Sequence, residues 1–408
     1  MVSFGVRLRV CAINVLLLGT AVCVPIPSAG QAAANAGAAD TLAQIADEIL
    51  EAQTQGGSYA KELIEPLMDL SFVYQEKGDY ALELAALEQA RQVVRANYGL
   101  SSLEQAPLMR QQIRAEESRG NFGEAWAIEQ ALLTLAKKHP DDARTAPIYH
   151  EIGDKRMDLR RSYLAGERPP QLTLGCYYHG SQPQLISDGS NCASGERDEA
   201  ILHMTLDAQR NYANAIAVLR RQQEHSGGEL YELEDKLFRN SYFLRDYQTG
   251  RQSLVRLIYD DAQNGEPMLS RIERLIQLAD WDLLYDQRTL AFDLYAKTHA
   301  FLEQRGLAQA SIDELFAPAV PILLPTFQPN LFAPELAERA TGYVDVMFDV
   351  SRYGRTSRIR VLDSTHDASN IVQRRVARWV VDNRFRPRVT DGQAVDAERI
   401  VARAYVQE

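Results

Sequence analysis

The residues best suited to chemistry are scattered through this sequence rather than grouped. The seven histidines, at positions 139, 150, 179, 203, 225, 299 and 366, occur singly. Carboxylate pairs such as Glu116-Glu117 and Asp260-Asp261 fall where turns or solvated helix faces are expected, and nothing around them implies a shifted pKa. The motifs GxSxG, HExxH, GxGxxG and the P-loop do not occur. We therefore expect no catalytic residue, no metal site and no cofactor, and we expect that the protein is not an enzyme.

Cys176 and Cys192 are the two side chains that could react with one another. An even number of cysteines in an exported chain favours a disulfide. The bond would close a loop of about sixteen residues and, by the chain-entropy argument, stabilise the fold by ~3 kcal/mol. The alternative is a pair of metal-binding thiols near His179, although no CxxC or HxxxH spacing accompanies them. We predict the disulfide.

The first 32 residues have the pattern of a secretory signal peptide. Arg7 and Arg9 precede an almost wholly apolar run at 10–24, which is followed by prolines and small residues. The run is about fifteen residues long and a spanning helix needs roughly 20, so an uncleaved inner-membrane anchor is the weaker alternative. Cleavage would remove Cys11 and Cys23. We expect an exported bacterial protein that resides in the periplasm.

The long middle of the chain repeats itself with a period of about 41 residues. Pro66-Leu67-Met68 recurs as Pro107-Leu108-Met109 and again as Pro147-Ile148-Tyr149. Each unit predicts two helices joined at a Gly-x-aromatic turn, the first pair at 67–77 and 80–97. Small residues on the second helix allow close helix packing. The pattern resembles the tetratricopeptide repeat (TPR) in a long-period variant, and the resemblance implies stacked helical hairpins with a partner-binding groove.

We expect this TPR-like array to cover residues 40–316 with five to six hairpins. A segment rich in Gly, Pro, Ser and Asn, at 166–198, interrupts it and contains the cysteine pair. In the final hairpin, helices at 268–279 and 287–305 are expected to flank a turn at Asp280-Trp281. Residues 317–333 carry four prolines among Ile, Leu and Phe, which predicts an extended linker that packs along a domain surface.

Residues 334–408 predict a small α+β module. Val344, Val346, Phe348 and Val350 alternate with more polar residues, which is typical of a strand, and a second alternating run follows the turn at Gly354. Apolar residues at helical spacing follow up to Val380, Pro387 ends that helix, and a last alternating run closes the chain. The fold class is therefore mostly α, with a C-terminal module built on a three-stranded antiparallel sheet.

The order of these elements resembles the C-terminal domain of the TonB family. The match comprises a Gly-led strand, a Gly turn, a second strand, a helix ending in Arg-Phe-Arg-Pro, an Asp-Gly turn and a last strand. The core and turn residues that carry it are Gly342, Val344, Phe348, Gly354, Trp379, Phe385, Pro387 and Gly392. In that family the domain captures a short segment of an outer-membrane transporter and transmits energy from the inner membrane.

Charge divides the chain at the linker. Residues 340–408 contain twelve arginines, no lysine and nine acidic residues, whereas the chain as a whole carries a net charge of −11. The acidic array and the mildly basic module are therefore suited to pack against each other or to bind partners of opposite sign. An acidic, exported chain without a binding motif also argues against nucleic acid as a partner.

We interpret the sequence as a non-enzymatic periplasmic adaptor that binds protein partners, which include outer-membrane or periplasmic proteins. The repeat groove would take one partner, and the last strand, as a sheet edge, would take another by strand addition. That strand comprises Arg399, Ile400, Val401, Ala402, Arg403, Ala404, Tyr405 and Val406. The alternative is a TonB-type energy transducer, although a retained anchor and a long periplasmic spacer are not evident. Pairing of two modules into a homodimer is a further arrangement that the strands would permit.

Overall fold

The structure, a computed structural model, describes residues 29–167, 194–222, 227–263, 265, 267–316, 319–365 and 370–406. The chain divides into two compact units at 1–100 and 101–408. Most of the predicted signal peptide and the pair Cys176 and Cys192 lie outside the described residues. Among the described residues no helix is both long enough and apolar enough to span a membrane.

The first unit is helical. It contains α1 (Ala29–Gly56), α2 (Ile64–Lys77) and α3 (Tyr80–Tyr98), with α2 and α3 packed as a hairpin. Gly78 ends α2 in the left-handed conformation, φ 73°, which glycine adopts without steric cost. Leu67, Leu87 and Ala90 are buried in this hairpin. The predicted helices at 67–77 and 80–97 are therefore confirmed.

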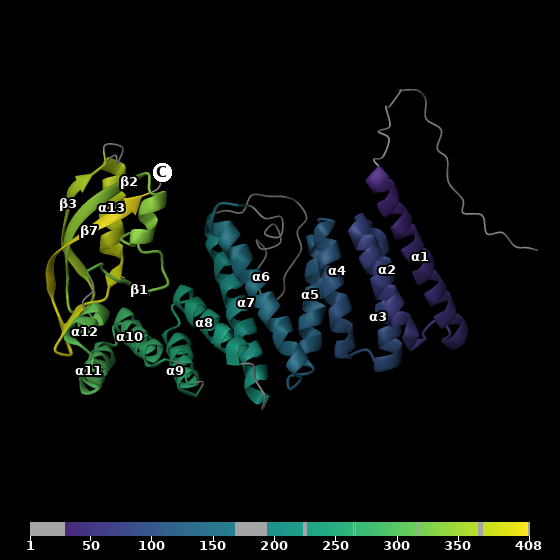
Figure 1. The fold of residues 1–408 in the computed structure, drawn as a ribbon, viewed down its shortest axis with the longest axis horizontal. Coiled ribbons are helices and arrows are strands. Elements are labelled where there is room, and N and C mark those ends of the chain that lie inside the picture. The colour runs from purple at the N-terminus through teal and green to yellow at the C-terminus, as the bar shows by residue number, and fades with distance from the viewer. Residues whose placement is uncertain are drawn as a thin grey trace, which may run out of the picture. The chain divides into compact units, whose positions relative to one another are not determined.

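The second unit continues the helical hairpins. Four pairs, α4–α5, α6–α7, α8–α9 and α10–α11, follow one another (Figure 1), and α12 succeeds them. Their bounds are α4 Ala106–Ser118, α5 Phe122–Lys137, α6 Ala146–Leu164, α7 Ser194–Arg221, α8 Gly227–Phe243, α9 Tyr247–Gln263, α10 Met268–Leu284, α11 Arg288–Gln304 and α12 Gln309–Phe316. The partner of α6 is α7, so the hairpin that the sequence left unfinished closes across the insertion.

The sequence period reappears as a structural one. Short 3₁₀ turns at Lys61–Leu63, Leu103–Gln105 and Ala143–Thr145 precede α2, α4 and α6, and a proline follows in the first turn of each helix. Proline suits this position because its missing N–H has no partner inside the helix. The side chains of Ser102 and Asp142 cap the second and third 3₁₀ turns. The fold class predicted from the sequence, a mostly helical TPR-like array followed by a small sheet module, is confirmed.

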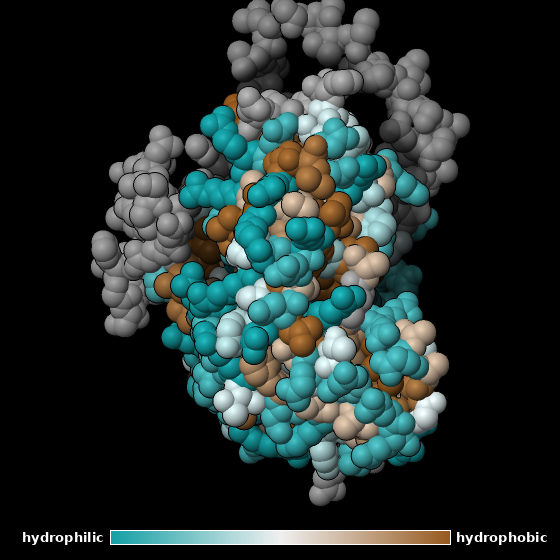
Figure 2. Space-filling model, turned by 90° about the vertical axis from the view of Figure 1, so that its left-hand side faces the viewer, coloured by the Kyte–Doolittle hydropathy of each residue, from teal (hydrophilic) through white to brown (hydrophobic). Residues whose placement is uncertain are grey.

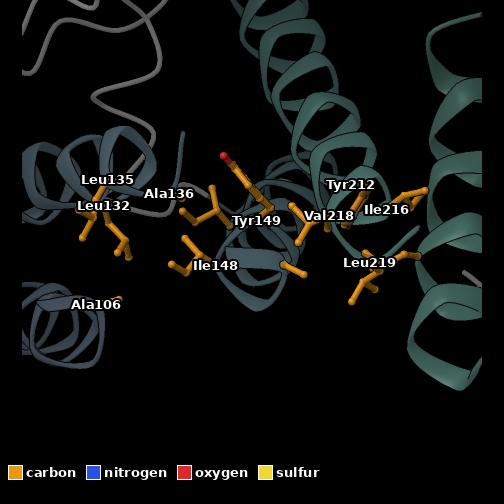
Figure 3. Close-up of a cluster of buried hydrophobic side chains, with 14 of the residues drawn as sticks. Ala106, Leu132, Leu135, Ala136, Ile148, Tyr149, Tyr212, Ile216, Val218 and Leu219 are labelled. Atoms are coloured by element: carbon orange, nitrogen blue, oxygen red, sulfur yellow. The ribbon is translucent and has the colours of Figure 1, made fainter. Parts of the chain in front are cut away.

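A continuous apolar core joins neighbouring hairpins. Leu132, Ile148 and Ile216 come from α5, α6 and α7 and pack in one cluster (Figure 3). Close approach of α6 and α7 depends on Gly153, because a Cβ there would lie 2.6 Å from the ring of Tyr212. The hydroxyl of Tyr212 donates to Asp154 at 2.9 Å. The small residue thus fixes the distance between the two helices.

One predicted turn is wrong. Asp280 and Trp281, expected between the last two helices, lie inside α10, which runs to Leu284. Both are almost fully buried, and Asp286, at φ 59°, forms the actual turn. Trp281 packs on Gly250 of α9, where a Cβ would come within 2.2 Å of the indole. Asp79-Tyr80 and Asn121-Phe122 lie at turns in the earlier repeats, but here the similar Asp-Trp pair is buried within the helix.

The C-terminal module contains a three-stranded antiparallel sheet in the order β3-β2-β7 (Figure 1). Its strands are β2 (Gly342–Val350), β3 (Thr356–Ser364) and β7 (Ala397–Val406), and α13 (Asn370–Asp382) covers one face. Val344, Val346, Phe348 and Val350 are buried together, as their alternation predicted. A small hairpin, β5 (Arg388–Thr390) and β6 (Gln393–Val395), encloses the Asp-Gly turn at 391–392.

The proline-rich linker packs onto both the helical array and the C-terminal module of the second unit. Its strand β1 (Leu323–Leu324) pairs with β4 (Arg384–Phe385), which the sequence did not predict. Phe332 enters the module core, where its ring stacks on Phe348 at 5.6 Å. The described part of the linker is therefore a component of the fold, which agrees with its apolar composition.

Candidate protein-interaction site

The Arg-Phe-Arg-Pro segment joins the module to the helical array. As alternation along a strand requires, the side chain of Phe385 enters the module core, whereas Arg384 and Arg386 face the array. Arg386 donates from Nε and Nη2 to the carboxylate of Asp280 in α10, at 3.0 and 2.5 Å. This is the two-pronged geometry that arginine forms with a carboxylate.

The Arg386–Asp280 pair is buried. The side chains retain 10% and 3% of their exposure. The hydroxyl of Tyr295 in α11 donates to the same carboxylate at 2.6 Å, and Arg386 Nη1 donates to the carbonyl of Leu315 at 3.2 Å. Burial lowers the pKa of Arg386, but the charge and hydrogen bonds of Asp280 outweigh burial and raise it overall. Burial, and then Asp280, raises the pKa of Tyr295. The phenol therefore stays neutral and the guanidinium stays charged.

A second ion pair lies nearer the surface. Arg384 donates to Asp286 at 2.9 and 3.2 Å and to the carbonyl of Leu283 at 2.8 Å. The hydrogen bond from Arg384 lowers the pKa of Asp286. Gly354 allows its turn to lie close to the backbone of Phe385, because a Cβ at Gly354 would lie 2.5 Å from the carbonyl oxygen of Phe385. These contacts pair the basic module with the acidic array, one of the two outcomes that the charge division suggested.

The last strand lies at one edge of the sheet. The N–H of Thr365 donates to the carbonyl of Tyr343, so the backbone groups of Tyr343 point toward β3. Those of the next residue, Val344, point toward β7, where it pairs with Ala404. Along β7 the backbone groups of Ala402 and Ala404 consequently face β2. Those of Val401, Arg403 and Tyr405 point outward.

Only part of this edge is open. The N–H of Tyr405 donates to the carbonyl of Leu331 in the linker at 2.9 Å. At the other end, the N–H of Arg399 donates to the carboxylate of Asp349 at 2.8 Å. Between them, no described residue pairs with the outward backbone groups of Val401 and Arg403. The open edge, as we call the outward backbone groups of these two residues, can accept a short extended segment.

A cavity of about 340 Å³ lies beside the open edge. Its walls come from α12, the linker, the Arg-Phe-Arg-Pro segment and the beginning of β7. The lining is mixed. Its charged residues are Arg386, Arg388, Asp396 and Glu398, and its apolar residues are Phe316, Ala319, Pro321, Ile322, Val350, Pro387, Ala397, Ile400 and Val401. The cavity has room for one large side chain of a bound segment. We call it the edge pocket.

The opposite edge of the sheet is less regular. The register between β2 and β3 shifts twice, and Arg358 adopts φ 53° at the second irregularity. Such bulges twist an edge and oppose pairing with another strand. The β2–β7 register shifts once, between Phe348 and Val350, so residues 400–406 of β7 are regular. Of the two edges, β7 is the better template for strand addition.

The module also exposes apolar side chains. Val401 and Leu362 retain 58% and 51% of their exposure, and Ile371, predicted on the buried stripe of the helix, retains 61%. Figure 2 shows hydrophobic side chains, in brown, scattered over a largely hydrophilic face. Single apolar residues on a surface are ordinary. The exposed side chain of Val401 projects from a face of the sheet next to the open edge, where a side chain of an added strand would contact it.

The predicted core and turn residues occupy the places that the module requires. Val344, Phe348 and Phe385 are fully buried, and Trp379 packs against Phe385 with ring centroids 5.8 Å apart. Gly354 and Gly392 have φ of 73° and 72°. Gly342 packs against Thr365, and Pro387 lines the edge pocket. Of the eight predicted edge residues, β7 contains all, from Arg399 to Val406, but their outward groups are only partly open.

The sequence did not reveal three residues of this region. Asp280 was assigned to a turn, Arg386 to the end of a helix, and Phe327 to a linker without a specified contact. The alternation Arg-Phe-Arg was a usable signal, since opposite faces of a short strand should have different neighbours. Among the described residues, no group of three or more His, Cys, Asp or Glu side chains is arranged to hold a metal ion.

Comparisons with known proteins do not supply a family. No family model matches the chain, and no curated protein matches it. Among solved structures, TPR-like repeats of a protein described as a kinesin light chain of Podosopora anserina match with a TM-score of 0.30 at 15% identity. The match covers 60% of this chain and 97% of that chain, and a point variant of the same repeats gives the same score over 59% and 95%. Scores of this size transfer no function.

Proposed function

We propose that this protein is a non-enzymatic adaptor of the bacterial periplasm that captures an extended segment of a protein partner on β7. The observation that carries the proposal is the open edge at Val401 and Arg403 beside the edge pocket. Strand addition of this kind uses main-chain hydrogen bonds for affinity and side-chain pockets for specificity. The export signal in the sequence supports the location.

The geometry supports one kind of ligand, a short extended segment. An added strand would form hydrogen bonds with the outward N–H and C=O groups of Val401 and Arg403. Each hydrogen bond would contribute about 0.5–1.5 kcal/mol to binding. Side chains of a strand alternate, so every second one would face the edge pocket. Because the pocket holds about 340 Å³ and its lining combines apolar side chains with charged ones, the preferred segment carries one large residue there that has both an apolar body and a polar group. The segment is short, since Leu331 and Asp349 occupy the flanking positions.

The attachment of the module supports an adaptor over an energy transducer. Arg386 and Arg384 bind the array through two ion pairs, and the linker adds β1 to β4. A transducing module must act at a distance from its anchor, whereas an adaptor benefits from a fixed spacing between two binding surfaces. The stacked hairpins provide the second surface, because repeat arrays bind partners along their length. The partner that we propose is an outer-membrane or periplasmic protein. If the captured chain is instead a second copy of this protein, the modules would form a homodimer.

Site-specific photocrosslinking of the full chain in cells tests the proposal. A photoreactive residue replaces Val401 in one variant and Val361, on the opposite edge, in the control. We expect adducts from position 401 that map to one extended partner segment, and few from position 361. Adding Arg403→Pro, which removes an outward N–H, should abolish the adduct, whereas Val361→Pro should leave it intact. Equal adducts from both edges, or an adduct that survives Arg403→Pro in a folded variant, would overturn the proposal.

A further inference from the structure

A phenylalanine of the linker packs against aromatic residues of the helical array. The ring of Phe327 makes edge contacts with Phe238 at 5.4 Å and with Tyr242 at 5.7 Å. The guanidinium of Arg239 lies 5.3 Å from the centre of the same ring. The three residues that contact Phe327 share α8, and Phe238 also packs on Trp281 of α10 at 4.9 Å. We call this set, Phe238, Arg239 and Tyr242, the aromatic recess.

The phenylalanine is presented on a tight turn. The N–H of Gln328 donates to the carbonyl of Pro325 at 3.0 Å, which places Phe327 at the third position of a four-residue turn. Pro329 follows directly, so prolines stand on both sides of the turn. A turn of this kind projects one side chain away from its backbone with little conformational freedom to lose on binding.

The tip of the turn, residues 326–329, is less buried than the linker on either side of it. Before it, Leu323 and Leu324 are buried and paired with β4, and Pro325 is buried beside them in sequence. After it, Phe332 is buried in the module core. Between these anchors, Thr326 and Pro329 are exposed, and the contact from Gln277 to the Thr326 hydroxyl is long, at 3.4 Å. The ring of Phe327 thus supplies the aromatic contacts of the tip, and the anchors on either side of the tip do not depend on that ring.

We infer that the aromatic recess is a ligand site whose resting occupant is the chain's own turn. The ligand that it fits is a proline-flanked turn with a phenylalanine at its third position, supplied by a partner protein. The recess shares no residue with the open edge or the edge pocket, so this inference stands apart from the proposed strand addition. A tethered turn competes at an effective concentration in the millimolar range, which keeps the site closed to weak ligands.

A peptide titration of the full chain tests the inference. The probe is a fluorescent peptide of sequence Pro-Thr-Phe-Gln-Pro-Asn-Leu, which copies residues 325–331. Fluorescence anisotropy compares the wild-type chain with Phe327→Ala, in which the recess is vacated. We expect the probe to bind the variant at least tenfold more tightly than wild type. A control peptide with alanine in place of phenylalanine should bind neither chain.

Two further measurements keep the result decisive. Circular dichroism establishes that Phe327→Ala is folded, and Tyr242→Ala added to it should remove probe binding, because one of the two aromatic contacts to the ring is then lost. Absence of probe binding to folded Phe327→Ala would overturn the inference and would mean that Phe327 only packs the linker onto α8. Equal binding to wild type and variant would overturn it as well, because the probe would then bind elsewhere.

Discussion

Replacement of Arg386 by alanine is the sharpest test of how the module is fixed to the array. Arg386 donates two hydrogen bonds to Asp280 and a third to the carbonyl of Leu315. Its removal leaves a carboxylate with 3% exposure that keeps, among the described residues, only the hydroxyl of Tyr295 as a donor. The variant therefore buries an uncompensated negative charge, whereas the wild type buries a neutral pair.

The uncompensated charge determines the expected loss in the free energy of unfolding. Breaking a buried ion pair by removing one partner destabilises a protein by about 3–5 kcal/mol. Asp280→Ala should cost a similar amount, because it leaves the guanidinium of Arg386 uncompensated. The double variant should cost less than the sum of the two by at least about 1.5 kcal/mol, since neither charge remains. Arg388→Ala, two residues along and exposed, should change the free energy of unfolding by less than about 0.5 kcal/mol.

Urea unfolding monitored by tryptophan fluorescence provides the assay. Trp281 in α10 and Trp379 in α13 lie on the two sides of the contact, so their emission reports on both the array and the module. The reasoning predicts a large fall in the urea midpoint for Arg386→Ala and none for Arg388→Ala. Equal midpoints for these two variants, or additive costs in the double variant, would refute it.

Two other predictions follow from single contacts. Gly250→Ala should destabilise the chain by about 1–3 kcal/mol in the same unfolding assay, because the new Cβ would lie 2.2 Å from the Trp281 ring, whereas Gly228→Ala, with open space around it, should be neutral or stabilising. The hydrogen bond from Arg384 is the largest cause of the lowered pKa of Asp286 in the folded chain. This interaction should contribute at most about 1 kcal/mol to the free energy of unfolding. The contribution is present above pH ~4, near the pKa of an unfolded Asp, and is lost as pH falls through the lower pKa of the folded chain. Asp286→Asn should remove that part of the acid dependence of unfolding, and an unchanged pH profile would contradict the assignment.

Local patterns in the sequence predicted most of the elements. The 41-residue period located α2 to α6, because Pro at a helix start and Gly at a helix end act within a single turn. Alternation located β2, and the Asp-Gly turn at 391–392 located the β5–β6 hairpin. These signals depend on neighbours along the chain, so one sequence is sufficient to read them.

The connections between distant segments were not predictable in the same way. Arg386 and Asp280 are 106 residues apart, and neither has a neighbour in sequence that suggests a partner. Pairing of β1 with β4 brings Leu323 beside Phe385, and only the assembled core decides that register. For the same reason the edge strand could be named from the sequence, but Leu331, which closes one end of it, could not.

Residue-resolved amide hydrogen exchange along β7 tests the central claim most directly. The account predicts that the amides of Ala402, Ala404 and Tyr405 exchange slowly in the free chain, because β2 and Leu331 accept them, and that those of Val401 and Arg403 exchange rapidly. Capture of a partner on the open edge should then protect Val401 and Arg403. Slow exchange of these two amides in the free chain, or rapid exchange that persists after capture, would contradict the claim that β7 binds partners by strand addition.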